Sequence, residues 1–556
     1  MVALPSVAEH RCSIYAYGAQ RDANLSRVRL SRHQWQRISD PPLPQGFKTV
    51  DAWLSNQYSM ELWLQRALES HPWRTADPAK ASVLFIGSNI SQDCVAERPV
   101  AAHDLWTALR SDRLLWPGPA AATAAASWTT DEAARTRFVA DAAHIKVMAT
   151  LYHRCAPPWT GNGGGRPPDL LALEDFVGVL ATPLERRSQM VTPFVVAQPP
   201  WLVAQDDAQD DAQDDDSHDG ADRVGADPTT GAAASSSSSS SVARPALVPL
   251  SARKLIFMAG HIPKAYVRPT RYLVWRALQQ FRPNATVVSS TLSCSTGSYA
   301  FACAHELTAQ PLSFFDTFCH RFCGPHAHCD HPSRNATTAE RAASLHSKCR
   351  LFRRLGEANW TARLPQMVLD THALSHAEYL QHAFGHRFCL VVPGDYPSTV
   401  KIGETIAIGG VGGCIPVFVV PTRHASARPS AERLAEGIAG LLPYTAWLDY
   451  CSLSFVLTEF TATRPALLIE SVRRLAAVGE EALAAKLRAL RAVRHAFVYR
   501  HGSSLDAPSA PEFILAEACR MASELRASSP PSSATQSYAS GPQAIAGGAH
   551  ERCRLD

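Results

Sequence analysis

The chain has 556 residues, of which 46% are hydrophobic and 19% are charged, and its formal net charge is +4. This length is too great for one hydrophobic core, so we expect two domains of about 200 residues each, with additional segments. The composition excludes a chain that is disordered throughout. The sequence shows no Lys/Arg cluster with interleaved aromatic residues, which argues against nucleic acid as a partner.

The first part of the chain alternates apolar segments with segments of helical pattern. Strands are predicted in CSIYAYG near residue 12, in SVLFIGS near residue 82 and in MVTPFVV near residue 190. A helix is predicted over Asp131 to Tyr152. This alternation is typical of an α/β domain, which we assign to residues 1–204.

An acidic and serine-rich stretch follows at residues 205–249. Ten Asp and one Arg occur between Asp206 and Asp227, and Ser235 to Ser241 are seven consecutive serines. Such a composition cannot bury apolar surface, so the stretch is predicted to be a disordered linker rather than a metal site. The rest of the chain is correspondingly basic, which suits phosphates or acidic glycans.

Order is predicted to resume at Leu250 with a second α/β domain, assigned to residues 250–525. It closes with a helix over Glu480 to Tyr499, and a disordered tail of small residues is predicted at 526–556.

The most informative segment runs from Phe388 to Phe418. FCLVV is apolar on both faces, as a strand of a parallel sheet is. GDYPS follows at its carboxyl end and consists of residues that are typical of turns. KIGETIAI can then open a helix whose amino terminus favours an anion, and a second buried strand follows in CIPVFVV. Ligands of open α/β sheets bind at such carboxyl ends, so this segment is a candidate phosphate site. The alternative is an ordinary unit of the core.

Asparagine and cysteine usage predicts a lumenal protein. Five of the seven Asn begin an Asn-x-Ser/Thr acceptor: Asn24, Asn89, Asn284, Asn335 and Asn359. Six of the fourteen Cys fall between Cys294 and Cys349, a density that indicates local disulfides. Within CHRFCGPHAHCDH, residues 319–331, zinc is the competing interpretation, although the spacing fits no standard zinc module. Cys389, Cys414 and Cys451 lie in or beside apolar strands and are predicted to be buried thiols.

No targeting signal is visible in the sequence. The amino-terminal MVALPSVAEHRC contains no apolar core of signal-peptide length, and no run of eighteen apolar residues occurs anywhere. We expect a lumenal catalytic portion whose membrane anchor is missing from this sequence. The alternative is a different localisation.

Five blocks resemble the exostosin-type glycosyltransferases, glycosyltransferase family 47. The strongest combines a strand ending in Pro-x-Gly-Asp, then Pro-Ser, a basic residue, an acidic residue and Gly-Cys-Ile-Pro-Val, here Pro393, Gly394, Asp395, Pro397, Ser398, Lys401, Glu404 and Gly413 to Val417. The others are CSIYAYG near residue 12, Gln57 to Ser88, Lys254 to Trp275, and LPYTAWLDYCSLSFVLTE, which ends at Glu459.

The resemblance implies the GT-B architecture, in which two Rossmann-like domains face a central cleft. It also implies an inverting transferase that moves a sugar from a UDP-sugar, bound to the second domain without a metal or other cofactor, to a glycan or glycoprotein acceptor at the first domain. Family members are typically type II proteins of the Golgi membrane, and the resemblance adds pairing with another glycosyltransferase as an expectation. The alternative is a non-catalytic member that stabilises an active enzyme.

Stabilisation of the leaving diphosphate is expected from cations: Lys264, Arg268 and Arg271 in one segment, and Lys401 at the start of the helix after FCLVV. Arg268 is the preferred candidate, because a guanidinium can hold two oxygens at once. Glu404 follows Lys401 by three residues on the same helical face, and the resemblance implies that it binds the ribose hydroxyls. Gly394, Asp395 and Ser398 are assigned to the same nucleotide-sugar site. Asp395 and Ser398 are expected to shape the turn or cap the helix, and the alternative is direct contact with the donor.

The catalytic base is the least determined residue. PPWTGNGGGRPPDLLALEDF, residues 157–176, resembles a degenerate form of a family segment that ends in Arg-Asp-His, and the His is absent here. Asp169 and Glu174 are therefore weak candidates. GGVGG at residues 409–413 is longer than the resemblance predicts, and is expected either to reshape the donor site or to extend a surface loop.

Overall fold

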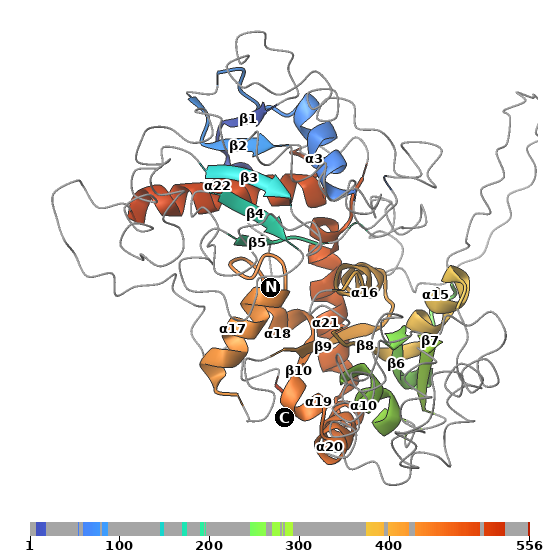
Figure 1. Ribbon diagram of the computed structural model, residues 1–556. Coiled ribbons are helices and arrows are strands. Elements are labelled where there is room, and N and C mark those ends of the chain that lie inside the picture. Colours follow the sequence, from blue (N-terminus) through green and yellow to red (C-terminus); the bar gives the residue numbers. More distant parts are fainter. Residues whose placement is uncertain are drawn as a thin grey trace, which may run out of the picture.

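The computed structural model describes residues 7–17, 54, 59–77, 80–86, 145–149, 170–174, 189–193, 195, 245–262, 270–278, 281, 284–292, 374–393, 399–421, 429–500, 505–528 and 554–555. These residues form an α/β structure with two parallel five-stranded sheets (Figure 1). The predicted α/β class is therefore confirmed.

The first sheet has its strands in chain order. They are β1 (Ile14–Tyr17), β2 (Val83–Ile86), β3 (Ile145–Ala149), β4 (Leu170–Glu174) and β5 (Gln189–Val191), and each neighbouring pair is parallel. A Rossmann-like sheet reverses its strand order part of the way across, and the described strands of this sheet do not.

The helix predicted over Asp131 to Tyr152 is wrong at its carboxyl end, because β3 occupies residues 145–149. Ile145 pairs with Val83 of β2, and Lys146 pairs with Leu170 of β4. The segment IKVMA contains two β-branched residues, and its place between two strands outweighs the helical pattern around it.

Between β1 and β2, helix α3 (Met60–Glu69) buries one face against the first half of the molecule. The buried apolar residues Met60, Trp63, Leu64 and Leu68 recur at the spacing of an amphipathic helix. The strand predicted in SVLFIGS, after this helix, corresponds to β2 and is confirmed.

The second sheet has the order β10-β9-β8-β6-β7, again all parallel. Its strands are β6 (Lys254–Ile262), β7 (Ala285–Leu292), β8 (His386–Val391), β9 (Ile415–Val420) and β10 (Phe455–Thr458). Counted along the chain this is the order 2-1-3-4-5, a doubly wound arrangement whose direction reverses between β6 and β8. Loops on either side of such a reversal diverge, which places a ligand site at the carboxyl ends of β6 and β8.

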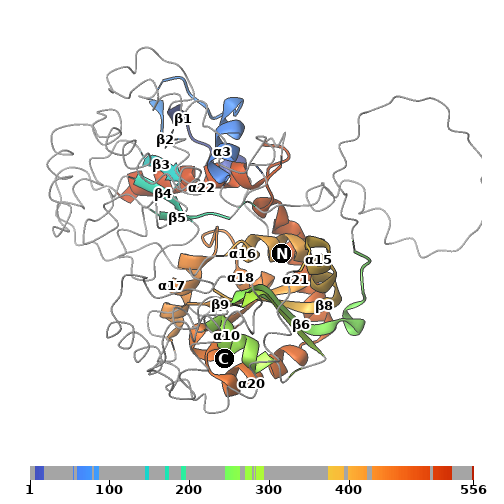
Figure 2. The same cartoon turned by 45° about the vertical axis from the view of Figure 1, so that its right-hand side comes forward.

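Helices connect and cover this second sheet (Figures 1 and 2). They are α10 (Thr270–Leu278), α15 (His376–Gly385), α16 (Lys401–Gly410), α17 (Ala431–Leu441), α18 (Tyr450–Leu453), α19 (Glu459–Ala462), α20 (Pro465–Ala476) and α21 (Glu480–Val493), which continues into the 3-10 helix η8 (Arg494–Phe497). The closing helix predicted over Glu480 to Tyr499 corresponds to α21 and η8.

The last long helix, α22 (Ala510–Ser528), returns to the first sheet (Figure 1). It contacts α3, β2 and η1 (Val7–His10), and a disulfide joins its Cys519 to Cys12. Most of α22 lies in the range assigned to the second domain, yet it packs on the first half of the molecule.

The glycine-rich segment 409–413 is a packing element and not a surface loop. Gly409, Gly410 and Gly413 are buried, and a Cβ on Gly409 would lie 2.7 Å from Leu490 Cδ1 of α21. Gly412 has a φ of +89°, a backbone conformation that L side chains rarely adopt. The segment ends α16 just before β9 begins, at the amino ends of the strands, so it cannot reshape a donor site at their carboxyl ends.

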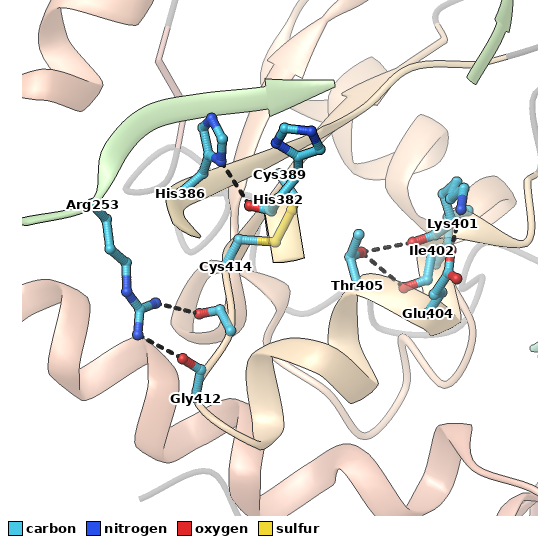
Figure 3. Close-up of a disulfide and its surroundings, with 11 residues drawn as sticks. Arg253, His382, His386, Cys389, Lys401, Ile402, Glu404, Thr405, Gly412 and Cys414 are labelled. Carbon is cyan, nitrogen blue, oxygen red and sulfur yellow. Dashed lines mark hydrogen bonds and ion pairs between the residues drawn. A yellow bond between two sulfur atoms is a disulfide. The ribbon is translucent and has the colours of Figure 1, made fainter. Parts of the chain in front are cut away.

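Arg253, at the entrance to β6, fixes this turn. Its guanidinium donates to the carbonyl oxygens of Gly413 (2.9 Å) and Gly412 (2.8 Å), and its Nε donates to that of Val248. Figure 3 shows Arg253 and Gly412 at the opposite end of α16 from Lys401 and Glu404.

The prediction of buried thiols at Cys389, Cys414 and Cys451 is wrong. Cys389 and Cys414 form a disulfide with a Cα–Cα distance of 5.5 Å (Figure 3), and Cys451 is disulfide-bonded as well. Cys389 lies in β8 and Cys414 directly precedes the neighbouring strand β9, so parallel pairing brings their Cβ atoms within bonding reach.

The tail predicted at 526–556 is ordered at both ends of its range. α22 continues to Ser528, and Arg554 and Leu555 dock beside β10. Among the helices of the described ranges, none is long and apolar enough to cross a membrane.

Candidate functional site

The candidate site lies where the second sheet reverses its strand order. α10 begins after β6 and α16 begins after β8, so the amino termini of both helices lie at the carboxyl ends of the central strands. The amino terminus of a helix carries a partial positive charge, and two of them converge at this edge. This is the position at which doubly wound sheets bind their ligands.

Lys401 and Glu404 form an ion pair in the first turn of α16 (Figure 3). Lys401 Nζ lies 2.5 Å from Glu404 Oε2. The Glu404 side chain is almost fully buried (6% exposed), whereas that of Lys401 is 27% exposed. The prediction that the two residues share one helical face is confirmed, and the pair places a partly accessible cation above a buried carboxylate.

Tyr379, on α15, completes this cluster. Its hydroxyl hydrogen-bonds the Glu404 carboxylate, and Lys401 Nζ lies 3.6 Å from the centre of its ring. Burial, reinforced by the Glu404 carboxylate, raises the pKa of Tyr379 well above its usual value, so the hydroxyl stays protonated and donates to Glu404. We call Tyr379, Lys401 and Glu404 the α16 triad.

Sequence reasoning missed Tyr379 because it lies more than twenty residues before Lys401. A signal was present for its helix, since Ser375 and Glu378 form a capping box that fixes the start of α15. That signal locates the helix one turn before Tyr379. It does not reveal that the ring would meet α16.

Arg271 connects the ends of the two central strands. Its Nε donates to the carbonyl oxygen of Val392, the residue after β8, at 3.0 Å. Its guanidinium also lies near Gly260 of β6, where an added Cβ would be 3.6 Å from Nη1. The half-buried Arg271 therefore brings positive charge to the reversal point, as expected for a residue that binds phosphate.

Glu459 brings a second carboxylate to the carboxyl ends of the strands. It is the first residue of α19, directly after β10, and its Oε1 accepts a hydrogen bond of 2.6 Å from the hydroxyl of Thr270, the first residue of α10. This contact ties the start of α10 to the end of β10. Neither residue was among the predicted site residues.

The other predicted site residues fall mostly outside the described ranges. Glu174 is the last residue of β4, at the carboxyl end of a strand of the first sheet, and its side chain is not described. Those outside are Asp169, Lys264, Arg268, Gly394, Asp395 and Ser398, together with the cysteine-rich residues 319–331.

In the described part of the chain, no three His, Cys, Asp or Glu side chains are grouped so as to hold a metal ion. Charged side chains described at the carboxyl ends of the second sheet include two cations, Lys401 and Arg271, and two carboxylates, Glu404 and Glu459. Such a set can bind an anionic group and accept hydrogen bonds from hydroxyl groups.

Comparison with known proteins gives no relative for this chain. No protein-family model matches it. No curated protein and no solved structure matches it either.

Proposed function

We propose that this protein is an inverting glycosyltransferase of the exostosin type, with the GT-B architecture and a UDP-sugar donor. The observation that carries the proposal is the Lys401–Glu404 ion pair, in the first turn of the helix that follows β8 at the reversal point of a doubly wound sheet. It joins the residues of the strongest sequence motif to the place where such sheets bind nucleotides.

The donor would lie across the starts of α10 and α16. Arg271 and Lys401, together with Lys264 and Arg268, would stabilise the negative charge that develops on the leaving diphosphate. These cations take the role that a metal ion has in other transferases, so EDTA should not reduce activity.

Glu404 is suited to bind the ribose. Its carboxylate holds one ammonium and one hydroxyl in the described structure, and a carboxylate can accept about four hydrogen bonds. Capacity therefore remains for a ribose hydroxyl. Because Tyr379 and Lys401 fix the rotamer of Glu404, the site would be organised before the nucleotide arrives.

The acceptor, a glycan or glycoprotein, would bind the first half of the molecule. Two parallel sheets and a final long helix that crosses from one half to the other are consistent with a two-domain transferase. Asp169 and Glu174 remain the proposed bases for the acceptor hydroxyl, with Glu174 at the carboxyl end of β4.

The disulfides of the described residues favour the Golgi lumen, with attachment to the Golgi membrane. All five cysteines in the described ranges are disulfide-bonded, which is typical of an oxidising compartment. Asn284, the acceptor residue of one glycosylation motif, is exposed at the start of β7.

One observation favours a second candidate, a non-catalytic partner of an active transferase. Glu404 already neutralises Lys401 and receives the Tyr379 hydroxyl, an arrangement that could serve stability alone. Such a protein would keep the fold and would not turn over a donor.

Turnover distinguishes the two candidates. The protein, secreted from a eukaryotic host, is incubated with a panel of UDP-sugars and a mixture of glycan acceptors, and release of UDP is measured with and without EDTA. We expect release with one sugar, unaffected by EDTA and at least tenfold slower in Glu404→Gln. Binding of a UDP-sugar without any release would favour the non-catalytic partner.

A further inference from the structure

The outer edge of β10 is occupied by a segment far away in sequence. Among the described strands, β10 is the last in the order of the second sheet, so one of its edges is paired with β9 and the other with no described strand. Arg554 forms a parallel bridge with Val456 on that edge, and the Leu555 N–H donates to the Val456 carbonyl oxygen at 3.2 Å. The segment therefore extends the sheet by one isolated β-bridge.

Helix α20 holds the same segment from its other side. The carbonyl oxygen of Leu555 accepts hydrogen bonds from the Ser471 hydroxyl (3.1 Å) and from Arg474 Nη1 (3.2 Å). The Leu555 side chain is 7% exposed and belongs to the main apolar cluster. Both polar backbone atoms of Leu555 thus have partners, and its side chain is removed from water.

We propose that the edge of β10 and the adjoining face of α20 form a recognition surface for a short extended segment with a leucine. The occupant is the chain's own Arg554–Leu555, bound in cis. We call Val456, Ser471 and Arg474 the β10 edge site. Strand addition of this kind takes its affinity from main-chain hydrogen bonds and its specificity from the pocket of one side chain, here that of Leu555.

The chain can make this connection within one molecule. α22 ends at Ser528, and the intervening residues 529–553 can span at most about 80 to 90 Å when fully extended. A tethered segment has an effective concentration in the millimolar range, so weak contacts suffice to keep the edge site filled. Filling it also protects an unpaired strand edge from pairing with another chain.

Docking at this site should steady the proposed donor site, although the inference does not depend on that function. β10 leads directly into α19, whose Glu459 receives the Thr270 hydroxyl, and α20 packs against α10. The segment therefore fastens both elements that position the Glu459–Thr270 contact.

The test uses the full chain and a fluorescent peptide of residues 549–556 with Cys553→Ser. In the wild type the edge site is filled, so we expect the peptide to bind at least tenfold more weakly than it binds Leu555→Asp. A peptide that itself carries Leu555→Asp should not bind either protein.

Adding Arg474→Ala to Leu555→Asp should weaken peptide binding about fivefold. Adding Arg473→Ala, an exposed neighbour that also pairs with Glu470, should not. Equal binding to wild type and Leu555→Asp, or binding to neither, would overturn the proposal.

Hydrogen exchange provides a second measurement if Leu555→Asp does not fold. The amide of Leu555 should exchange at least fivefold faster in Arg474→Ala than in the wild type or in Arg473→Ala. Equal rates in the three proteins would contradict the edge site. Protection that rises with protein concentration would contradict binding in cis, because it would show that a second copy supplies the segment.

Discussion

Glu404 is the residue on which the proposed donor site depends. Its carboxylate is buried, and a buried carboxylate is stable only when it is paired and hydrogen-bonded. Lys401 and Tyr379 meet that requirement. Glu404→Ala would leave both partners without their acceptor and would confuse a loss of binding with a loss of folding. Glu404→Gln keeps the shape of the side chain and is the better probe.

Glu404→Gln should weaken binding of the preferred UDP-sugar by about 1 to 3 kcal/mol, because a charge-assisted hydrogen bond to the ribose is replaced by a neutral one. Calorimetric titration measures the change. Tyr379→Phe is the matched control, since it keeps the ring beneath Lys401 and removes the hydroxyl that meets Glu404. It should weaken binding less than Glu404→Gln, and the reverse order would contradict the assigned roles.

His386 makes stability depend on pH. It is 2% exposed, its Nδ1–H donates to the His382 carbonyl oxygen, and its Nε2 meets the Thr286 hydroxyl. Burial lowers the pKa of His386 to about 4. The hydrogen bond to the His382 carbonyl oxygen acts in the opposite direction, and the charges of His382 and Lys254 lower the pKa further. Between about pH 6.5, the ordinary pKa of a histidine, and about pH 4, the unfolded chain binds a proton at this residue and the folded chain does not.

The free energy of unfolding should therefore fall as the pH is lowered, by roughly 2 kcal/mol from this residue between about pH 7.5 and about pH 5. Urea unfolding at the two pH values measures the loss. In His386→Gln the loss should be smaller by about that amount. Part of it should remain, because burial lowers the pKa of His71 and of His495 to about 4 as well. An unchanged pH dependence in the variant would contradict this account.

Residues that meet within one helical turn could be predicted from the sequence, and residues that meet through tertiary packing could not. Lys401 and Glu404 are three residues apart, so helical geometry alone places them on one face. Tyr379, the Glu459–Thr270 contact and the Cys389–Cys414 disulfide each join separate elements. A single sequence carries no direct signal for which elements will be neighbours.

Among the elements, α16 runs from the carboxyl ends of the central strands of the second sheet to their amino ends. Its first turn holds the α16 triad, and its last turn packs closely on α21 through glycines. At Gly409 an added Cβ would lie 2.7 Å from Leu490 Cδ1 and 2.9 Å from the Cys414 carbonyl oxygen. The carbonyl belongs to the backbone and cannot rotate away.

Gly409→Ala should therefore destabilise the protein by about 1 to 3 kcal/mol, the usual cost of overpacking. Gly385→Ala is the control, because Gly385 also ends a helix and an added Cβ there meets nothing within 4 Å. That variant should be neutral or slightly stabilising. Denaturant unfolding of both variants measures the difference, and equal stabilities would contradict the close approach of α16 and α21.

The strands that could be predicted are those with an apolar run in the sequence. IYAY in β1, VLFI in β2, FCLV in β8 and IPVFVV in β9 are such runs, which is how a strand buried on both faces looks in sequence. β3 was mistaken for part of a helix, because its five residues are flanked by alanine-rich sequence and its identity comes from pairing with β2 and β4.

For the whole molecule, α22 is the main connection between the two halves. It follows η8 of the second half, packs on α3 and β2 of the first, and is bound to Cys12 through Cys519. The ring of Trp63 on α3 contacts that of Tyr499, whose hydroxyl donates to the Pro193 carbonyl oxygen. The disulfide therefore fixes to the first half a helix that follows η8 of the second half in the chain.

Replacing both cysteines, as Cys12→Ala with Cys519→Ala, should lower the free energy of unfolding by about 2 to 5 kcal/mol, the range for native disulfides. Hydrogen exchange should show where the loss occurs. We expect faster exchange in α22 and unchanged exchange in β8 and β9. Faster exchange in all of these elements would show that the bridge stabilises the whole molecule and not the crossing helix.

The acidic linker predicted at residues 205–249 lies almost entirely outside the described ranges. Whether it contributes to the stability of the whole molecule can be tested by deletion. If it is a linker, deletion of residues 206–241 should change the thermal unfolding midpoint by less than about 2 °C, since a longer loop costs little. Calorimetric scanning of the deletion variant measures this. A clearly larger drop would show that the segment supports the fold.

The α/β class and the number of sheets could be predicted from composition and apolar runs, but the strand orders could not. The reversal between β6 and β8 and the sequential order of the first sheet depend on how connections cross the sheets. The return of α22 to the first sheet is another non-local choice, because η8, the helix before it in the chain, packs on α16 and α21 of the second half.

The proposed donor site requires that the start of α16 binds the nucleotide of a UDP-sugar. This can be measured by calorimetric titration of the wild type and of Glu404→Gln with a UDP-sugar panel, with and without EDTA. We expect micromolar binding of one sugar by the wild type, unchanged by EDTA and at least fivefold weaker in the variant. Absence of binding across the panel, or equal affinity in a folded variant, would contradict it.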